Sequence, residues 1–349
     1  MQQIRTVLCS FGMSGKIFHA PFIHQNPGFI LRGVWERSKK TAAELYPGII
    51  SYDSYEAILT DPEVDLVVVN TPNITHFEYT KEALLAGKHV VVEKPFTTTV
   101  AEAIELEELA VKQDRVMSVY QNRRFDSDIT TVRRIIEEGA LGTIVEAEIH
   151  YDRYNQVLSP KPHKEVAVKG TGVLYDLGPH VIDQALWLFG MPQAVFADIM
   201  KLRPNSIVDD YFEILLYYPQ LRVRLKSGYT VMEPIPAYVF HGTNGSFIKQ
   251  RADVQEVKLQ AGLMPVDESW GVEEPGSAGL LHTNIDGQPK KVVVASGTGD
   301  YGRFYEGLYD AIQNSLFEDK FVPASAGTNT IRIIEAAYKS QDEKRIVEL

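Results

Sequence analysis

The sequence predicts an α/β protein of two domains, with a doubly wound parallel sheet in the first and a large open sheet of mixed or antiparallel strands in the second. Over the first 122 residues, short β-branched runs alternate with helical patterns, which is typical of βαβ units. After that point the alternation stops. The length of 349 residues also suits two domains of roughly 150 residues each. We therefore expect one domain over residues 1–122 and a second over residues 123–349.

Six strands are predicted in the first domain, at Thr6–Cys9, Phe29–Trp35, Ile49–Tyr52, Asp65–Asn70, His89–Glu93 and Val116–Gln121. Three Thr-x-x-Glu patterns predict capping boxes, in which the two side chains bond N–H groups of the first helical turn. They are Thr41–Glu44, Thr75–Glu78 and Thr99–Glu102. Gly87 is expected to end a helix as its C′ residue. A sheet of this kind binds its ligand beyond the carboxyl ends of the strands.

The second domain is predicted to begin with a helix at 129–138 that ends at Gly139. Alternating runs then predict strands at 144–151, 194–200, 211–218, 221–227, 238–242 and 246–250. A Gly-Thr-Asn-Gly turn at 242–245 indicates a hairpin. Two helices, at about 302–316 and 329–339, complete the chain.

Composition excludes several classes of function. The chain has 35 Lys and Arg against 46 Asp and Glu, a formal net charge of −11, which argues against a nucleic acid or an anionic membrane as partner. Cys9 is the single cysteine, so no intrachain disulfide can form, and no Cys/His cluster has the spacing of a metal site. The N-terminal apolar run is too short for a signal peptide or a membrane span. We expect a cytoplasmic protein that binds no metal.

A glycine-rich turn follows the first predicted strand. It reads Ser10-Phe11-Gly12-Met13-Ser14-Gly15, and a helical run begins at Lys16. This is a G-x-G-x-x-G dinucleotide fingerprint with Ser10 at the first glycine position. Gly12 would let the backbone approach a pyrophosphate, and Gly15 would let helix and strand pack closely. The alternative is an ordinary strand-to-helix turn.

Glu36 lies 21 residues after Gly15, at the end of the second strand. An acidic side chain at this offset accepts hydrogen bonds from the adenosine ribose, which slightly favours NAD. Arg37 follows directly and could pair with the 2′-phosphate of NADP. The residues alone therefore leave NAD and NADP both open.

Two further strand ends should reach the same crevice. The fourth strand ends in Asn70-Thr71-Pro72-Asn73 with His76 close behind, and the fifth ends in Glu93-Lys94-Pro95. Parallel strands deliver their carboxyl ends to one edge, so the Lys94 ammonium would stand beside the reactive ring of a cofactor. The alternative is a surface lysine. The complete predicted cofactor site is Phe11, Gly12, Met13, Ser14, Gly15, Glu36, Arg37, Asn70, Thr71, Pro72, Asn73, His76, Glu93, Lys94 and Asn122.

Asp176 and His180 form the chemically distinctive pair of the second domain. They are four residues apart, so on a helix they would share a face, although Pro179 complicates that helix. A histidine beside a carboxylate is a usable general base near neutral pH. The alternative is a buried pair whose two members only satisfy one another.

Taken together, these motifs resemble the Gfo/Idh/MocA oxidoreductase family. The resemblance is carried by Gly12–Gly15, by Glu93-Lys94-Pro95 and by the run from Gly170 through Asp176 to His180. A narrower similarity, to the scyllo-inositol dehydrogenase branch, is carried by 18–21, 119–124, 151–154 and 331–337. Ser10 and Glu36-Arg37-Ser38 depart from the usual pattern.

The resemblance implies an N-terminal Rossmann domain, a C-terminal α/β domain, and a homodimer or homotetramer formed through the open sheet. It also implies that Lys94, Asp176 and His180 are catalytic, in a reversible NAD(P)-dependent oxidation of a secondary alcohol on a small polyol or sugar such as an inositol. The predicted substrate-binding residues are Lys94, Arg124, Tyr151, Arg153, Tyr154, Asp176 and His180, with Asn155 and the stretch 161–169 beside them.

Two other functions remain open at this stage. An NAD-dependent glycosidase would oxidise a sugar transiently and eliminate its glycosidic substituent. A sugar-sensing or NAD(P)-sensing protein would bind without turnover, but the presence of all three candidate catalytic residues argues against it. Lys161, Lys164 and Lys169 could equally form a solvated rim.

Overall fold

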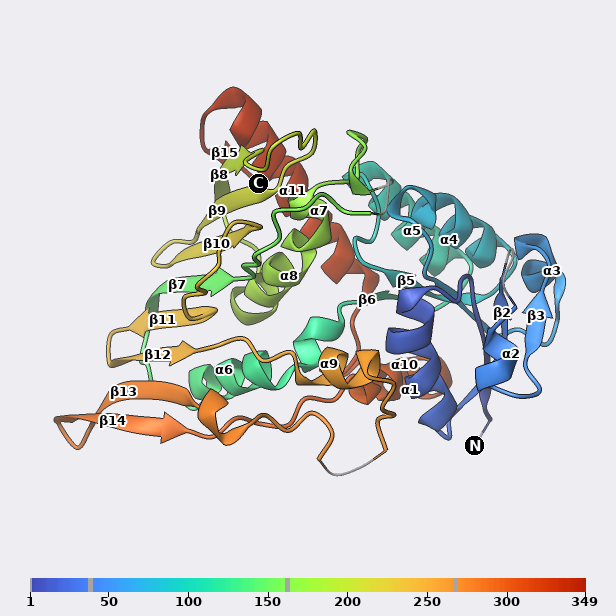
Figure 1. Cartoon of the computed structure of the whole chain (residues 1–349), viewed down its shortest axis with the longest axis horizontal. Helices are drawn as coiled ribbons and strands as arrows, with labels where there is room; N and C mark the ends of the chain where they lie inside the picture. Colours follow the sequence, from blue (N-terminus) through green and yellow to red (C-terminus); the bar gives the residue numbers. More distant parts are fainter. Residues whose placement is uncertain (1, 37–39, 161–163, 267–268) are drawn as a thin grey trace. The chain divides into compact units, whose positions relative to one another are not determined.

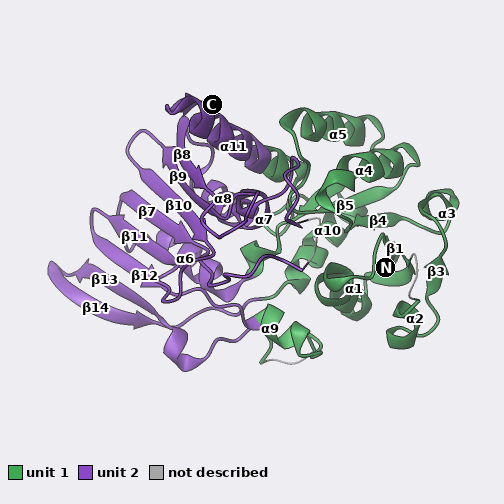
Figure 2. Cartoon of the chain, turned by 45° about the horizontal axis from the view of Figure 1, so that its top comes forward, with its two compact units in different colours: residues 1–125, 255–270, 300–328 green, residues 126–254, 271–299, 329–349 purple. Residues whose placement is uncertain are grey.

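A computed structural model of the chain describes residues 2–36, 40–160, 164–266 and 269–349 (Figure 1). It divides into two compact units (Figure 2). Unit 1 contains residues 1–125, 255–270 and 300–328, and unit 2 contains residues 126–254, 271–299 and 329–349. Two segments late in the chain, 255–270 and 300–328, thus return to the unit that holds the N-terminus.

The sheet of unit 1 confirms the predicted fold class. It has six strands in the order β3-β2-β1-β4-β5-β6, and every pair of neighbours is parallel. The order reverses between β1 and β4, the switch point at which a doubly wound sheet opens a crevice. All six predicted strands are present, as β1 Ile4–Leu8, β2 Phe29–Trp35, β3 Ile50–Tyr52, β4 Leu66–Val69, β5 His89–Glu93 and β6 Met117–Tyr120.

Helices connect these strands. They are α1 Ala20–Gln25, α2 Ala42–Leu45, α3 Tyr55–Thr60, α4 His76–Leu85 and α5 Val100–Lys112, with short helical turns η1 Gly15–His19, η2 Asn73–Thr75 and η3 Asn122–Phe125. In both views α4 and α5 lie side by side (Figures 1 and 2). The later segments add α9 Val254–Gln260, α10 Gly302–Asn314 and the start of α11 Ala324–Glu343.

One of the three predicted capping boxes is confirmed. Thr99 and Glu102 bond each other's backbone N–H groups at the start of α5. The other two predictions are wrong, because neither Thr41 nor Thr75 caps its helix with its side chain. The Thr75 hydroxyl instead lies 2.7 Å from the carbonyl oxygen of Pro72. Gly87 follows α4 with φ of +73°, as a C′ glycine should.

An aromatic cluster fills the core beside β1 and β2. Tyr305 and Phe304, on α10, are almost fully buried, and the Phe29 and Tyr305 ring centroids lie 5.5 Å apart. Tyr120, at the end of β6, meets Phe304 edge to face with centroids 4.7 Å apart. The segment 300–328, which contains α10, therefore completes the core beside the six-stranded sheet of unit 1.

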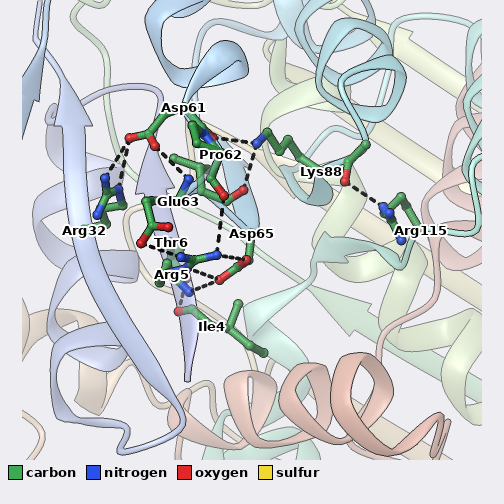
Figure 3. Close-up of polar contacts among 12 residues, drawn as sticks. Ile4, Arg5, Thr6, Arg32, Asp61, Pro62, Glu63, Asp65, Lys88 and Arg115 are labelled. Atoms are coloured by element: carbon green, nitrogen blue, oxygen red, sulfur yellow. Dashed lines mark hydrogen bonds and ion pairs between the residues drawn. The ribbon is translucent and has the colours of Figure 1, made fainter. Parts of the chain in front are cut away.

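Ion pairs secure the amino-terminal end of the same sheet (Figure 3). The Arg5 guanidinium donates two hydrogen bonds of 2.8 Å to the two carboxylate oxygens of Asp65. Arg32 pairs with Asp61 at 2.9 Å, and the largely buried Lys88 donates 2.8 Å and 2.9 Å bonds to the carbonyl oxygens of Asp61 and Val64. These contacts tie β1, β2 and the loop before β4 together at the end away from the crevice.

Unit 2 contains a nine-stranded mixed sheet in the order β14-β13-β12-β11-β7-β10-β9-β8-β15. Only β7 and β10 pair in parallel among the neighbours that the structure describes. The six predicted strands are confirmed as β7 Ile144–His150, β8 Ala194–Met200, β9 Tyr211–Tyr217, β10 Arg222–Gly228, β11 Tyr238–Gly242 and β12 Gly245–Lys249. The predicted hairpin joins β11 to β12.

Three strands of this sheet were not predicted, namely β13 Gly279–Ile285, β14 Gln288–Val294 and β15 Val347–Glu348. Helices α6 Ser127–Glu137, α7 Val173–Asp176 and α8 Gly178–Phe189 pack against the sheet, and α11 completes the unit. No helix in the described part of the chain is long and apolar enough to cross a membrane.

A buried ion pair stabilises the interior of unit 2. The Lys249 ammonium lies 2.7 Å from Glu273, and both side chains are at most 2 % exposed. Lys249 also donates to the carbonyl oxygen of Ser277 and to the Ser296 hydroxyl, each at 2.8 Å. Ser127 donates a 2.5 Å bond to the other oxygen of Glu273. Every charge in the network is therefore compensated, as burial requires.

We expect Glu273→Gln to lower the free energy of unfolding by about 3 kcal/mol, because it leaves the Lys249 charge buried without a counter-charge. Glu137→Gln is the matched control. Its partner Arg133 lies 2.6 Å away at the surface, where an i,i+4 pair contributes about 0.5 kcal/mol or less. Urea titrations of the two variants against the parent protein measure the difference. Equal losses in both would contradict the assignment.

Candidate functional site

The glycine-rich turn of unit 1 is hydrogen-bonded to the end of β4. Asn70 accepts a 2.9 Å bond from the backbone N–H of Ser10 and returns one of 2.9 Å to the Ser10 carbonyl oxygen. The Ser10 hydroxyl donates to the Asn70 carbonyl oxygen at 2.8 Å. The serine at the first glycine position thus adds a bond that glycine could not make, and the predicted cofactor residue Asn70 holds the loop in place.

The two glycines of this turn differ in their surroundings. A Cβ on Gly15 would lie 2.3 Å from the Ser10 carbonyl oxygen, so no larger residue fits there. A Cβ on Gly12 would meet no heavy atom of the described residues within 4 Å. Gly12 therefore leaves open space just before η1, and the start of a helical turn after a glycine favours an anion. This is the arrangement that a dinucleotide pyrophosphate requires.

Glu93, at the end of β5, is bonded to the same turn. Its carboxylate accepts hydrogen bonds from the Ser14 hydroxyl and from the backbone N–H of Lys94, the latter at 3.2 Å. The buried His19 ring lies between two partners: its Nε2 is 3.0 Å from the Glu93 carboxylate, and its Nδ1 is 2.6 Å from the Tyr305 hydroxyl. Burial raises the pKa of Glu93, but the bonds from His19 and Ser14 outweigh it and hold the pKa below its ordinary value. An ionised Glu93 therefore links the turn to Lys94, which is half-buried.

His76 joins the loops that follow β4 and β5. The ring is fully buried, with Nδ1 2.8 Å from the Pro95 carbonyl oxygen and Nε2 2.9 Å from that of Thr71. Burial lowers the pKa of His76, against the opposing effect of these carbonyl groups. Predicted as a cofactor residue, His76 joins the backbone just after Lys94 to the loop after β4, and its ring is fully buried.

Glu36 accepts hydrogen bonds from the start of α2. One carboxylate oxygen accepts from the backbone N–H of Thr41 at 2.9 Å and the other from that of Ala42 at 3.2 Å, and the residue is 7 % exposed. Glu36 thus caps the start of α2, the position that the Thr41 pattern was expected to fill. Arg37 lies outside the described residues.

The other predicted cofactor residues are spread along the strand ends of unit 1. Phe11 is buried and packs edge to face on Tyr46 at 6.3 Å, whereas Met13 is 45 % exposed. Thr71, Pro72 and Asn73 lie in the loop after β4, and the buried Asn122 begins η3 after β6. Arg124, predicted to bind substrate, is buried in η3 and belongs to unit 1.

The residues predicted from the second half of the sequence lie in unit 2. Asp176 is the last residue of α7, and His180 lies in the first turn of α8. Leu177, which has αR dihedrals, is the one residue between the two helices. Pro179 occupies that first turn without breaking it. Asp176 forms an ion pair of 2.8 Å with Lys164, whose side chain is 42 % exposed.

His180 lies among aromatic and cationic side chains. Its ring centroid is 5.8 Å from that of Tyr151, and the Arg153 guanidinium lies 5.2 Å from the Tyr151 ring. Arg251, which sequence reasoning missed, lies 4.1 Å from the same ring and donates to the His150 carbonyl oxygen. Unit 2 therefore places an imidazole, a phenol and two guanidinium groups around the Tyr151 ring, and such groups can hydrogen-bond a ligand rich in hydroxyl groups.

The remaining candidates lie apart from this group. Tyr154 is 52 % exposed, and Lys169 pairs with Glu335 at 3.1 Å. Lys161 lies outside the described residues. A cavity of about 780 Å³ in unit 2 includes Lys169 in its lining but neither Asp176 nor His180. Within the described residues, no group of three or more His, Cys, Asp or Glu could hold a metal ion.

Comparison with known proteins finds matches for both parts of the chain. Residues 4–121 match the family model described as an oxidoreductase family, NAD-binding Rossmann fold, and residues 133–349 match its C-terminal alpha/beta domain. The chain belongs to the Gfo/Idh/MocA family of oxidoreductases. Like its relatives, it is an NAD(P)-binding enzyme.

Individual members of the Gfo/Idh/MocA family are similar over nearly the full length. Scyllo-inositol 2-dehydrogenase (NADP(+)) IolW of Bacillus subtilis is 38 % identical over 99 % of this chain and 96 % of its own. The crystal structure of an oxidoreductase from Bacteroides fragilis is 45 % identical, with a TM-score of 0.91 and full coverage of both chains. That of yvaA from Bacillus subtilis is 37 % identical, with a TM-score of 0.96, and covers 100 % of this chain and 99 % of that one.

Substitution by alanine should affect a different property at each of the two glycines. We expect Gly15→Ala to destabilise the cofactor-free protein by about 2 kcal/mol, because the added methyl overlaps backbone. Gly12→Ala should change stability by less than about 0.5 kcal/mol, yet weaken NAD(P)H binding by at least about tenfold. Thermal melts and fluorescence titration with NADH and NADPH measure the two quantities. Full cofactor affinity in Gly12→Ala would show that the pyrophosphate lies elsewhere.

Proposed function

We propose that the chain is a dehydrogenase that reversibly oxidises a secondary alcohol of an inositol-like polyol or a sugar. The observation that carries this proposal is the His180 ring beside Tyr151, whose own ring lies against the Arg153 guanidinium, so that a candidate base and hydrogen-bond donors share one region of unit 2. The name of the Bacillus subtilis relative supports the substrate class. A levoglucosan dehydrogenase that is 34 % identical over 59 % of this chain and 56 % of its own supports it as well.

The proposed reaction uses three side chains of this protein. A bound nicotinamide dinucleotide supplies the hydride acceptor. His180 accepts the hydroxyl proton while the carbon is oxidised, and Asp176 stabilises the protonated ring. The Lys94 ammonium hydrogen-bonds the reacting oxygen and stabilises its developing negative charge. In the reverse direction His180 returns the proton to the same oxygen.

Substrate hydroxyl groups require partners once they are buried, since an unpaired one costs about 1–3 kcal/mol. We propose that Arg153, Tyr151 and Tyr154 provide these partners in unit 2, and Arg124 in unit 1. Arg251 joins this set because it lies against the Tyr151 ring. Discrimination between stereoisomers would come from the directions of these donors.

We propose that the enzyme uses NADP in preference to NAD. The earlier preference for NAD rested on a Glu36 carboxylate available to the ribose, whereas both of its oxygens accept bonds from the start of α2. Arg37 is then the residue suited to a 2′-phosphate. The relative from Bacillus subtilis is named for NADP(+).

The family resemblance suggests how the chain assembles, and its composition suggests where it is located. We propose a homodimer or homotetramer formed through the nine-stranded sheet, located in the cytoplasm. Sedimentation of the purified protein would test the first. A monomer at micromolar concentration would contradict it.

We expect His180→Ala to lower kcat by about 10²–10⁴, the usual contribution of a general base. Lys94→Met should lower it by about 10²–10³ through the loss of charge stabilisation at the oxygen. NADPH affinity should change little in His180→Ala. The assay follows absorbance at 340 nm over a panel of inositols, sugars and sugar acids.

The controls are exposed residues of the same type, His282→Ala and Lys112→Met, which should keep turnover. Near-normal turnover in His180→Ala would overturn the mechanism. Glycoside cleavage without accumulation of NAD(P)H would indicate a glycosidase instead, and cofactor binding without turnover on any polyol would indicate a sensor.

Cofactor choice gives a separate prediction. We expect Arg37→Ala to raise KM for NADP by about 10- to 100-fold, the effect of losing a charge-assisted hydrogen bond to phosphate, while KM for NAD stays nearly constant. Lys40→Ala is the control, because Lys40 already pairs with Asp53 at 2.7 Å. Equal KM changes for the two cofactors would contradict the role of Arg37.

A further inference from the structure

Two neighbouring carboxylates of unit 2, Asp209 and Asp210, are buried outside the groups used above. They are 9 % and 1 % exposed and precede β9. Burial of a carboxylate is costly unless hydrogen bonds or charges compensate it. The partners that compensate these two therefore indicate what they do.

Asp209 holds the start of α7. Its carbonyl oxygen accepts from the backbone N–H of Val173 at 2.8 Å, and its carboxylate accepts from that of Leu174 at 2.9 Å. The other carboxylate oxygen accepts a 2.8 Å bond from the Tyr338 hydroxyl of α11. The Tyr338 ring in turn stacks on Tyr175 of α7, with centroids 5.9 Å apart. Asp209 and Tyr338 thus bind three of the four residues of α7.

The approach of Asp209 to α7 depends on glycine. Gly172 has a φ of +93°, and a Cβ there would lie 2.1 Å from an Asp209 carboxylate oxygen. The Gly172 carbonyl oxygen accepts from the backbone N–H of Asp176 at 3.0 Å. The single turn that ends in Asp176 is therefore attached to Asp209 at its start and closed by its own hydrogen bond.

Hydrogen bonds and the burial of Val173, Leu174 and Tyr175 hold this turn, because its length gives it little rigidity of its own. A four-residue helix has almost no stability of its own. The cavity of about 780 Å³ adjoins the same group, since Tyr175, Asp209 and Tyr338 all line it. The cavity therefore leaves room beside these three side chains on one side.

Asp210 is connected through Arg203 and Glu165 to Lys164, the ion-pair partner of Asp176. Its carboxylate lies 3.0 Å from Nε of the buried Arg203, whose guanidinium lies 3.5 Å from Glu165. Glu165 is next to Lys164, which forms the ion pair with Asp176. Both the turn that carries Asp176 and the lysine paired with it are thus attached to residues 209–210.

We propose that Asp209 and Tyr338 are positioning residues that set the place of Asp176, and through it the basicity of His180. The structural part of this inference stands on the contacts of α7, and its catalytic part rests on the proposed function. Neither residue touches substrate or cofactor in this proposal.

The test uses Asp209→Ala and Tyr338→Phe in the full-length protein. Hydrogen exchange of peptides covering 172–178 should accelerate in both variants, while the remaining peptides of unit 2 stay protected. Asp342→Ala is the matched control, because Asp342 is exposed in the lining of the same cavity. We expect kcat to fall by about tenfold in Asp209→Ala, the usual effect of losing an outer partner, and by less in Tyr338→Phe.

The pH profile of kcat/KM separates positioning from general structural damage. A base that loses its carboxylate partner binds its proton less tightly, so the acidic limb should move to lower pH. Loss of folded enzyme would lower the profile without moving it. Tyr338→Phe changes no charge at neutral pH, so a shift in that variant reports position alone.

Unchanged exchange at 172–178 in both variants would overturn the proposal. Faster exchange with an unmoved acidic limb would overturn its catalytic part. If the parent protein turned over no polyol, the proposed function would fail, and the exchange measurement would still decide whether Asp209 and Tyr338 hold α7.

Discussion

The carboxyl edge of the six-stranded sheet can offer a rigid ligand site only because the loops after its strands are bonded to one another. Asn70 binds the loop after β1 to the end of β4, and His76 joins the loops after β4 and β5. Glu93 connects the end of β5 back to Ser14. The sheet alone fixes where strands end but not the course of the chain beyond them, so Lys94 depends on these contacts for its place.

In unit 2 a candidate catalytic residue, Asp176, is held in place although it does not lie at the end of a strand. Asp176 lies on a helix of four residues, which cannot be rigid by itself. Buried acceptors on Asp209 and the Tyr338 hydroxyl supply what the helix lacks. In both units, then, buried and fully compensated polar groups hold a candidate catalytic residue, and such networks specify one geometry because an unpaired member is costly.

Two acidic residues at strand ends of unit 1 accept hydrogen bonds from the protein itself. Glu36 caps α2, and Glu93 accepts from Ser14 and His19. Sequence spacing placed both correctly at strand ends. It could not show which way their carboxylates point, because the donors that capture them come from other turns of the chain. This distinction matters for cofactor choice, where the expected ribose acceptor is already occupied by backbone N–H groups.

The sequence by itself determined the six parallel strands, six strands of the second sheet and the chemically distinctive residues, because β-branched runs and short motifs are local properties. It missed β13, where small or polar residues such as Gly279 and Thr283 occupy buried positions. It also missed β14, where almost every residue is exposed. Only the tertiary structure returned 255–270 and 300–328 to unit 1 and placed Arg251 on Tyr151. It also decided that Glu36 would cap α2 in place of Thr41. These outcomes depend on contacts between residues far apart in the chain or on competition between nearby donors and acceptors, which no local pattern records.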